Sequence, residues 1–173
     1  MKTIPFLALS LLLLGCKSNL PLETVEYVDL NKYEGIWYDV ASFPQRFQKG
    51  CHCTSATYTQ KDKYVEVYNR CAKDSADGEI SSVSGKAFVK DEVTNAKLAV
   101  QFFWPFKGKY WIIGLDEDYR YAVVGEPGRR YLWILSRTRD MPDDLYEEAL
   151  EIAKSKGFDI SKLEKVNHSN CAE

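Results

Sequence analysis

The sequence has few histidines and no concentration of positive charge. Its two histidines are His52 and His168, and its 23 lysines and arginines are slightly outnumbered by 25 acidic residues, which gives a net charge of −2. Nucleic-acid-binding domains usually carry a basic patch or stripe, so nucleic acid is not expected as a partner. Neither histidine lies beside a serine or cysteine in a recognisable catalytic frame, so we expect a protein that is not an enzyme.

Residues that could hold a metal or a cofactor are also poorly placed. Cys51-His52-Cys53 brings metal-binding residue types together, but the spacing is poor for a zinc site of the Cys-x-x-Cys kind. No histidine is expected to face inward, where it could be the axial ligand of a haem. The sequence therefore predicts neither a metal site nor a cofactor.

The chain has no apolar run long enough to cross a bilayer as a helix. The N-terminal run Ile4–Leu14 is shorter than the ~20 apolar residues that such a helix needs, and no later run could span a membrane. Lys2 precedes this run, and a basic end followed by a short apolar core is typical of a secretory signal peptide. The run ends in Leu13-Leu14-Gly15-Cys16, which resembles the bacterial lipobox, whose cysteine thiol receives a diacylglycerol.

This layout divides the chain into a signal peptide (1–15), a tether lipidated at Cys16 (16–26) and one folded domain (27–173). Each buried CH₂ of the acyl chains would add ~0.8 kcal/mol of membrane affinity. An aspartate after the lipidated cysteine is the usual inner-membrane retention signal in enteric bacteria, and Lys17 stands there instead. The expected location is therefore the outer membrane, facing the periplasm. The alternative is an ordinary secretory signal that happens to contain a cysteine.

The remaining cysteines suggest an oxidising compartment. With Cys16 lipidated, four of the five are left, an even number that suits two disulfides with three ways to connect them: Cys51, Cys53, Cys71 and Cys171. One connectivity has local geometry in its favour, because the short turn at Asp62 would place Cys53 opposite Cys71 across a hairpin.

Short β-rich runs separated by turn signals predict an all-β domain. Apolar and polar residues alternate within them: Leu98, Val100 and Phe102 share one face, which gives each strand one dry face and one wet face. Eight such runs at this spacing suggest a sandwich or an up-and-down barrel. The expected strands are Ile36–Phe43, Cys53–Lys61, Tyr64–Cys71, Ser81–Lys90, Ala96–Trp104, Lys109–Leu115, Tyr121–Gly125 and Arg130–Ser136.

One segment near the C-terminus has a helical pattern instead. Met141–Lys156 carries Asp143 and Asp144 in its first turn, where the helix dipole favours negative charge, and Gly157 follows as a stop. An apolar stripe predicts that this helix packs on the outside of the sheet, and its members are Leu145, Ala149, Ile152 and Ala153.

Three motifs, in order, resemble those of the lipocalin family. They are Gly-x-Trp at Gly35 and Trp37, the stretch Asp116–Tyr119, and an arginine, Arg137, that ends the eighth strand. The resemblance covers essentially the whole mature chain and implies an eight-stranded antiparallel up-and-down barrel with one C-terminal α-helix packed outside. Further stretches resemble the bacterial outer-membrane lipocalins, relatives of apolipoprotein D: Phe47–Gly50, Tyr68–Cys71 and Tyr131–Arg137.

The resemblance assigns structural roles to the motif residues. Gly35 permits a tight entry into the first strand. Trp37 plugs the closed end of the barrel, and Arg137 lays its guanidinium against the indole, a contact of ~0.5–2 kcal/mol. The relatives' pairing also implies a disulfide between Cys53 and Cys171, which leaves Cys51 for Cys71.

The resemblance also implies a lipid-binding interior. The family's pattern points to Tyr58, Phe102, Trp111 and Trp133, and alternation adds Val100 and Ile113. Loops 43–50 and 104–108 would enclose the mouth with the aromatic residues Phe43, Phe47, Trp104 and Phe106. Nearby cations could meet a carboxylate or phosphate head group, or could simply be solvated surface charges: Arg46, Lys107 and Lys109.

The expected function is that of a non-catalytic carrier which binds, and stores or transports, fatty acids or lysophospholipids. Two alternatives remain from the sequence. One is an envelope adaptor or stress-response component with no ligand, and the other is an enzyme of lipocalin type that uses a pocket cysteine. The oligomeric state is left open, a homodimer included.

Overall fold

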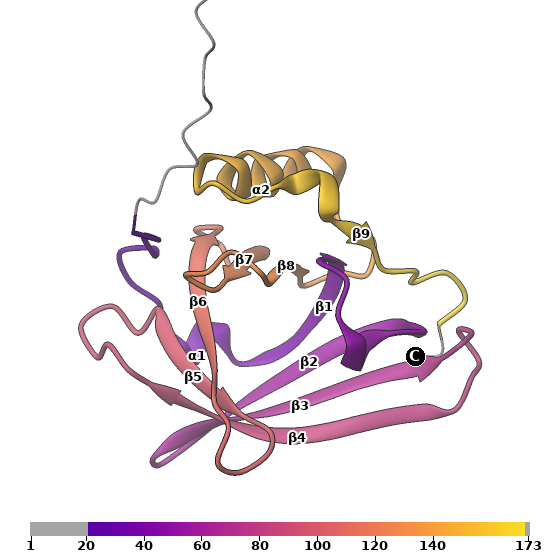
Figure 1. Cartoon of the computed structure of the whole chain (residues 1–173), viewed down its shortest axis with the longest axis horizontal. Coiled ribbons are helices and arrows are strands. Elements are labelled where there is room, and N and C mark those ends of the chain that lie inside the picture. Colours follow the sequence, from indigo (N-terminus) through magenta and orange to yellow (C-terminus); the bar gives the residue numbers. More distant parts are fainter. Residues whose placement is uncertain (1–20, 172–173) are drawn as a thin grey trace, which may run out of the picture.

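The computed structural model describes residues 21–171, which form a closed antiparallel β-barrel of eight strands with one helix outside it (Figure 1). Each strand from β1 to β8 pairs with its neighbours in sequence, and β1 pairs with both β2 and β8, which closes the barrel. The strands are β1 (Gly35–Ser42), β2 (Cys51–Lys61), β3 (Tyr64–Lys73), β4 (Ile80–Val89), β5 (Lys97–Gln101), β6 (Gly108–Leu115), β7 (Tyr121–Gly125) and β8 (Leu132–Ser136).

Short helices accompany the barrel. They are α1 (Leu30–Tyr33) before β1, the 3-10 turn η1 (Arg46–Gln48) between β1 and β2, the outer helix α2 (Asp143–Ser155), and the 3-10 turn η2 (Ile160–Lys162). The predicted barrel and outer helix are confirmed. The fifth strand ends at Gln101 rather than Trp104 and the eighth begins at Leu132 rather than Arg130, so both expected extensions belong to loops.

A ninth strand, β9 (Glu164–Lys165), was not predicted. It pairs with β1 at Ala41 and Ser42, beyond the point where β2 leaves β1, since the β1–β2 register ends at Tyr38. A two-residue strand is too short to give a periodic sequence pattern. It satisfies backbone groups of β1 that the barrel leaves unpaired.

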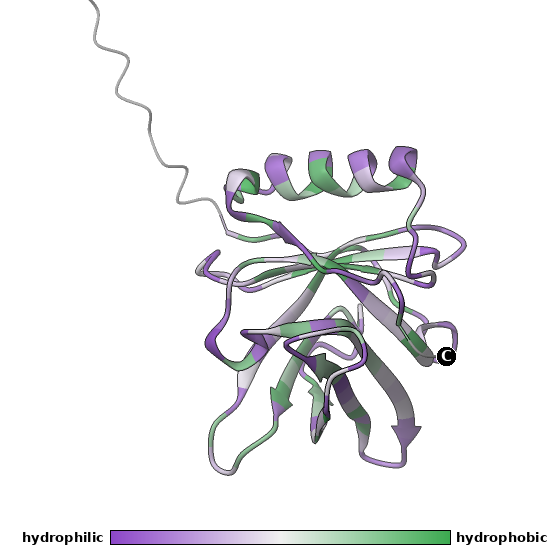
Figure 2. Ribbon diagram, turned by 90° about the vertical axis from the view of Figure 1, so that its right-hand side faces the viewer, coloured by the Kyte–Doolittle hydropathy of each residue, from purple (hydrophilic) through white to green (hydrophobic). Residues whose placement is uncertain are grey.

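The barrel wall separates two apolar clusters. The inner cluster lies inside the barrel, and its members include Trp37, Leu98, Val100, Ile112 and Leu135. The outer cluster lies between the wall and α2, and includes Ile113, Val123, Ile134, Leu145 and Ala149. Figure 2 shows the helix lying across one side of the barrel, with hydrophobic and hydrophilic residues interspersed along the strands.

Two glycines allow the C-terminal segment to approach the wall closely. A Cβ at Gly114 of β6 would lie 2.8 Å from Ile152 of α2, and one at Gly125 of β7 would lie 2.5 Å from the ring of Phe158. Both distances are shorter than side-chain contacts allow. Larger residues at these positions would push α2 and the following segment off the barrel.

The predicted end of the tether at residue 26 is wrong. Leu22 is buried in the outer cluster, and the backbone N–H of Val25 donates to the carbonyl of Ile112 at 3.0 Å. Residues from 22 onward therefore belong to the folded domain. The expected signal peptide 1–15 and the lipidation site Cys16 lie outside the described residues.

Within residues 21–171, no helix is both long enough and apolar enough to cross a membrane.

One end of the barrel is closed by α1 and by contacts between Trp37 and Arg137. The guanidinium of Arg137 lies 3.9 Å from the Trp37 ring centre, and it donates to the carbonyls of Ile36 (2.9 Å) and Lys32 (2.6 Å). The Trp37 indole N–H donates to the carbonyl of Tyr33 at 2.8 Å, which fixes α1 over the interior. Gly35 has a φ of +94°, a conformation that glycine adopts without strain.

The second motif lies at the same end, in the turn between β6 and β7. The Asp116 carboxylate accepts from the backbone N–H groups of Asp118 and Arg120, and it pairs with the Arg120 guanidinium at 2.6 Å. The Tyr119 hydroxyl accepts from the backbone N–H of Asp29, just before α1. The three motifs thus meet at the closed end of the barrel.

Replacing Arg137 should destabilise the barrel. Arg137→Ala removes the ring contact and the hydrogen bonds to backbone carbonyls, so we expect a loss of about 2–3 kcal/mol in the free energy of unfolding. Arg137→Lys keeps the charge but loses the planar fork, so its loss should be intermediate. Urea unfolding followed by tryptophan fluorescence measures both. Arg70→Ala, on the exposed side of β3, is the control, and equal losses in Arg70→Ala and Arg137→Ala would contradict this role.

Candidate functional site: the open half of the barrel

The end of the barrel opposite Trp37, which we call the open end because α1 does not cover it, is rich in aromatic residues. Phe102 and Trp133 pack against the inner cluster from positions near this end, and both are half-buried. The flanking loops carry four aromatic side chains that are 64–86% exposed: Phe47, Phe103, Trp104 and Phe106. Soluble proteins rarely gather this much aromatic surface without a ligand, partner or membrane to cover it.

Three tyrosines form the floor of this open half. The Tyr110 hydroxyl lies 2.8 Å from the hydroxyls of both Tyr33 and Tyr58. Burial raises the pKa of Tyr58 to about 12 and that of the other two well above 10, so all three are neutral. Below them the barrel is packed, because the cavity lined by these tyrosines, Val100 and Ile112 measures only about 10 Å³, the space of one water.

Four of the six predicted lipid-contacting residues face the interior. Val100 and Tyr58 belong to the inner cluster, and Phe102 and Trp133 pack against it. Val100 is in β5, and Phe102 lies two residues further along the chain, just after that strand ends. Trp133 is in β8, opposite Ser42 of β1. The structure therefore brings these four to one interior, with Tyr58 at the floor and Phe102 and Trp133 nearer the opening.

The prediction that Trp111 and Ile113 face inward is wrong. Ile113 is buried in the outer cluster under α2, Trp111 packs against the same cluster, and Tyr110 and Ile112 face the interior instead. Because α2 covers β6 from outside, both faces of this strand are apolar, and alternation alone could not fix which one is inside. Lys109 is exposed and shares a face with Trp111, which was the available signal.

Of the aromatic residues predicted around the mouth, some are exposed there and one is not. Phe47, Trp104 and Phe106 are exposed there, but Phe43 is buried in the outer cluster, 6.3 Å from the ring of Phe158. Lys107 places its ammonium 4.4 Å from the Phe88 ring centre, on the outer side of β4. Arg46 and Lys109 are exposed. None of these three cations is hydrogen-bonded to an interior side chain of the described residues.

Two disulfides hold the open end. Cys51 is bonded to Cys71, which links the start of β2 to β3, and Cys53 is bonded to Cys171, which holds the C-terminal segment against β2. These are the pairings that the resemblance implied, rather than Cys53 with Cys71. Among residues 21–171, no three histidine, cysteine or acidic side chains gather as metal ligands do.

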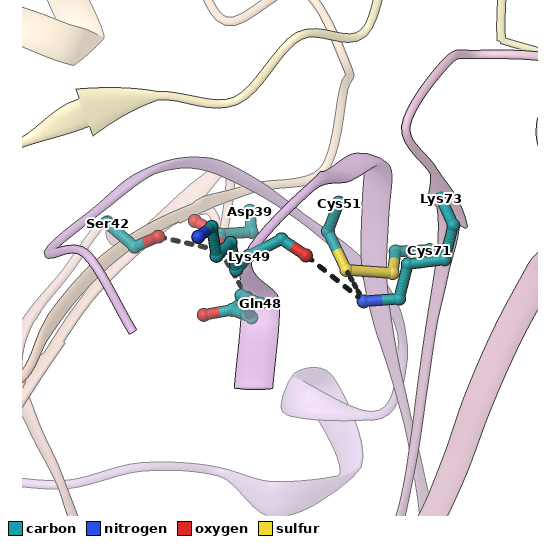
Figure 3. Close-up of a disulfide and its surroundings, with 7 residues drawn as sticks. All are labelled: Asp39, Ser42, Gln48, Lys49, Cys51, Cys71 and Lys73. Atoms are coloured by element: carbon teal, nitrogen blue, oxygen red, sulfur yellow. Dashed lines mark hydrogen bonds between the residues drawn. A yellow bond between two sulfur atoms is a disulfide. The ribbon is translucent and has the colours of Figure 1, made fainter. Parts of the chain in front are cut away.

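The interior also contains a carboxylate that was not predicted. Asp39 is two residues after Trp37, on the same face of β1, and is 3% exposed. Its Oδ2 accepts from Ser42 (3.1 Å) and from the Gln48 amide (2.9 Å), as Figure 3 shows. Burial raises its pKa to about 6, against the opposing effect of these two hydrogen bonds. Its position in the alternation from Trp37 was the signal that could have revealed it.

Comparison with known proteins places this barrel in a family. The model of the lipocalin-like domain matches residues 28–168. The chain belongs to the lipocalin family. This lipocalin is 38% identical to the outer membrane lipoprotein Blc of Escherichia coli K12, over 94% of this chain and 96% of the relative. It is 40% identical to temperature-induced lipocalin-1 of Arabidopsis thaliana, over 86% of this chain and 84% of the relative.

A solved structure agrees with the fold of this lipocalin. Insecticyanin from the tobacco hornworm Manduca sexta superposes with a TM-score of 0.70 at 20% identity, over 86% of this chain and 85% of the other. At that identity the likeness concerns the fold alone. Lipocalins are generally binding or transport proteins.

Asp39 should make the stability of this lipocalin depend on pH. Because its pKa rises from 3.8 to about 6 on folding, folding favours the protonated form, and stability falls as pH rises from about 4 to above 6. A rise of this size in the pKa of Asp39 corresponds to about 3 kcal/mol of stability. Asp39→Asn removes this loss, so the variant should gain stability relative to the wild type by about that amount between pH 4 and pH 8.

Urea unfolding of both proteins at pH 4, 6 and 8 measures this difference. Other titrating neighbours cancel in the comparison, including His168, whose Nε2 lies 2.8 Å from the Asp39 carbonyl. Asp62→Asn, which changes an exposed aspartate in the turn between β2 and β3, is the matched control and should follow the wild type. Parallel pH profiles for Asp39→Asn and the wild type would show that the Asp39 carboxylate carries no such cost.

Proposed function

We propose that this lipocalin binds a fatty acid or lysophospholipid in the open half of its barrel, and stores or transports it at the outer membrane. The observation that carries the proposal is the position of Phe102 and Trp133, half-buried on the interior wall beneath a rim of exposed aromatic residues. An alkyl chain laid between them would cover apolar surface that otherwise faces water. The four exposed rim aromatics suit an amphipathic ligand.

The energetics favour a single alkyl chain. Each methylene removed from water contributes about 0.8 kcal/mol, so ten contribute roughly 8 kcal/mol before ordering costs are subtracted. Eight kcal/mol alone corresponds to a dissociation constant of about 1 μM, and the ordering costs weaken the expected binding from there, to roughly tens of micromolar. The tyrosine floor limits how deeply the alkyl chain can enter, because the cavity beside it has room for about one water and not for further methylenes.

The same packed floor favours a second candidate. A barrel whose deeper half is filled by side chains could act as an envelope adaptor or stress-response component without a ligand. The third reading, an enzyme with a cysteine nucleophile, has less support, because all four cysteines of residues 21–171 are in disulfides. Binding of a lipid separates the first candidate from the second.

We propose further that Cys16 is acylated after removal of residues 1–15 and anchors the protein to the outer membrane, facing the periplasm. Two related proteins, one from E. coli and one from Vibrio cholerae, match over 94% of the chain and are named outer membrane lipoproteins, which supports this location. The described domain begins to pack at Leu22, so only a short segment would separate the anchor from the barrel.

Lipid binding should depend on Trp133 and not on Trp111. Titration with lysophosphatidylcholine and palmitate, followed by native mass spectrometry, should give a saturable one-to-one adduct with at least one of them. Trp133→Ala removes an interior wall and should weaken binding about tenfold or more. Trp111→Ala, a change of the same size on the outer face, should bind as the wild type does. The absence of any adduct at lipid concentrations of about 100 μM would contradict lipid binding and favour the adaptor.

Membrane attachment should depend on Cys16. In cells of a Gram-negative host, the wild type should fractionate with outer membranes and gain the mass of the acyl chains. Cys16→Ser lacks the thiol that accepts the diacylglycerol and should therefore appear as a soluble periplasmic protein or as an uncleaved precursor. Lys17→Asp provides the sorting control, because it should keep the acylation and move the protein to the inner membrane. A Cys16→Ser variant that stays in outer membranes would contradict the anchor.

A further inference from the structure

The hydrogen bonding around Asp39 is incomplete. Its Oδ1 is buried and has no partner, although Oδ2 accepts two hydrogen bonds. The Oε1 of Gln48, whose amide nitrogen donates to Oδ2, is also buried without a partner, as are both amide atoms of Gln45. Leaving a buried polar atom unpaired costs about 1–3 kcal/mol, so a group of them usually marks the place of a water or a ligand.

The unpaired atoms are mainly acceptors. Asp39 Oδ1 and Gln48 Oε1 belong to side chains that are hydrogen-bonded to each other through Gln48 Nε2 and Asp39 Oδ2 (Figure 3). A carboxylate and an amide oxygen can only accept, and what they lack is therefore a donor. A free carboxylate, which has no hydrogen to donate, could not satisfy them.

The charge of Asp39 is also uncompensated. Both of its side-chain partners, the Ser42 hydroxyl and the Gln48 amide, are neutral, and it forms no ion pair within residues 21–171. The titratable groups nearest to it do not supply a positive charge to the interior. Tyr58 is neutral, and burial lowers the pKa of His168, which contacts the Asp39 backbone.

We propose that Asp39, Ser42 and Gln48 form a subsite just inside the open end that binds the hydroxyl or ammonium group of an amphiphile and discriminates against a free carboxylate. This proposal rests on the proposed lipid binding, and it adds which polar end group of the ligand the barrel prefers. Uncharged or cationic single-chain amphiphiles are the class it takes.

The register of the strands places this subsite beside the proposed path of the alkyl chain. Asp39 is opposite Leu135 of β8 and Ser42 is opposite Trp133, so the polar cluster and the Trp133 ring stand on adjacent strands. Gln48 reaches the cluster from η1, the turn between β1 and β2. A ligand whose polar end donates to Asp39 can lay its chain along Trp133 toward Phe102 and Val100.

Three probes of equal chain length test the subsite: dodecylamine, 1-dodecanol and dodecanoate, titrated into the protein at pH 7.5. The amine and the alcohol should bind about tenfold or more tightly than the carboxylate, because only they donate to Asp39. In Asp39→Asn the three affinities should fall within about threefold of one another. Asp77→Asn loses the same charge in the loop between β3 and β4 and should keep the wild-type order.

The outcomes separate the subsite from lipid binding itself. Equal affinities for the three probes in the wild type, or an order unchanged in Asp39→Asn, would overturn the subsite while lipid binding stands. If Asp77→Asn also lost the wild-type order of affinities, the discrimination would come from the overall charge of the protein, and this result would overturn the subsite too. Failure of all three probes to bind would overturn both proposals.

A measurement on the wild type avoids dependence on the folding of Asp39→Asn. In the complex with dodecylamine, the methylene next to nitrogen should show nuclear Overhauser contacts to the Ser42 β protons and the Gln48 side-chain amide. Contacts of that methylene to residues on the outside of the mouth, such as Lys107, with none to Ser42 or Gln48, would overturn the proposal.

Discussion

The contact between the Arg137 guanidinium and the Trp37 indole joins the parts of the sequence that must meet for the barrel to close. Arg137 follows the last barrel strand, Trp37 stands in the first, and the guanidinium also binds the carbonyls of Lys32 and Ile36. One planar cation therefore links β8, β1 and α1. Phe102 and Trp133 lie toward the other end of the barrel, from which the ligand that we propose would enter.

Closure of the sheet also decides which residues meet inside. Alternate residues of each strand must face the interior, and the helix α2 makes the opposite face of β6, β7 and β8 apolar as well. The barrel thus has two apolar surfaces on one side, and only the inner one faces the barrel interior. The hydroxyls of Tyr33, Tyr58 and Tyr110 form a buried hydrogen-bonded network in that interior.

The sequence predicts the strands, the outer helix and the motif residues well because each depends on local pattern or on family motifs. The interior positions Tyr58, Val100, Phe102 and Trp133 follow from strands with one wet face or from the family pattern. Trp111 and Ile113 could not be placed by alternation, because helix packing makes both faces of β6 apolar. Leu22 looked like tether because its partner, the outer cluster, is formed by residues far away in the chain. Asp39 resembles a surface aspartate by residue type, and only its alternation from Trp37 indicates the inner face on which the structure shows it buried.

The most direct test of the binding site is the position of a heavy atom at the end of a bound chain. Crystals of the protein grown with 12-bromo-1-dodecanol would locate the bromine by its anomalous scattering. We expect one bromine peak inside the barrel, above the tyrosine floor and near Val100 and Phe102. A bromine peak between α2 and the wall, beside Trp111 and Ile113, would contradict this expectation, and so would an interior that stays empty at saturating ligand.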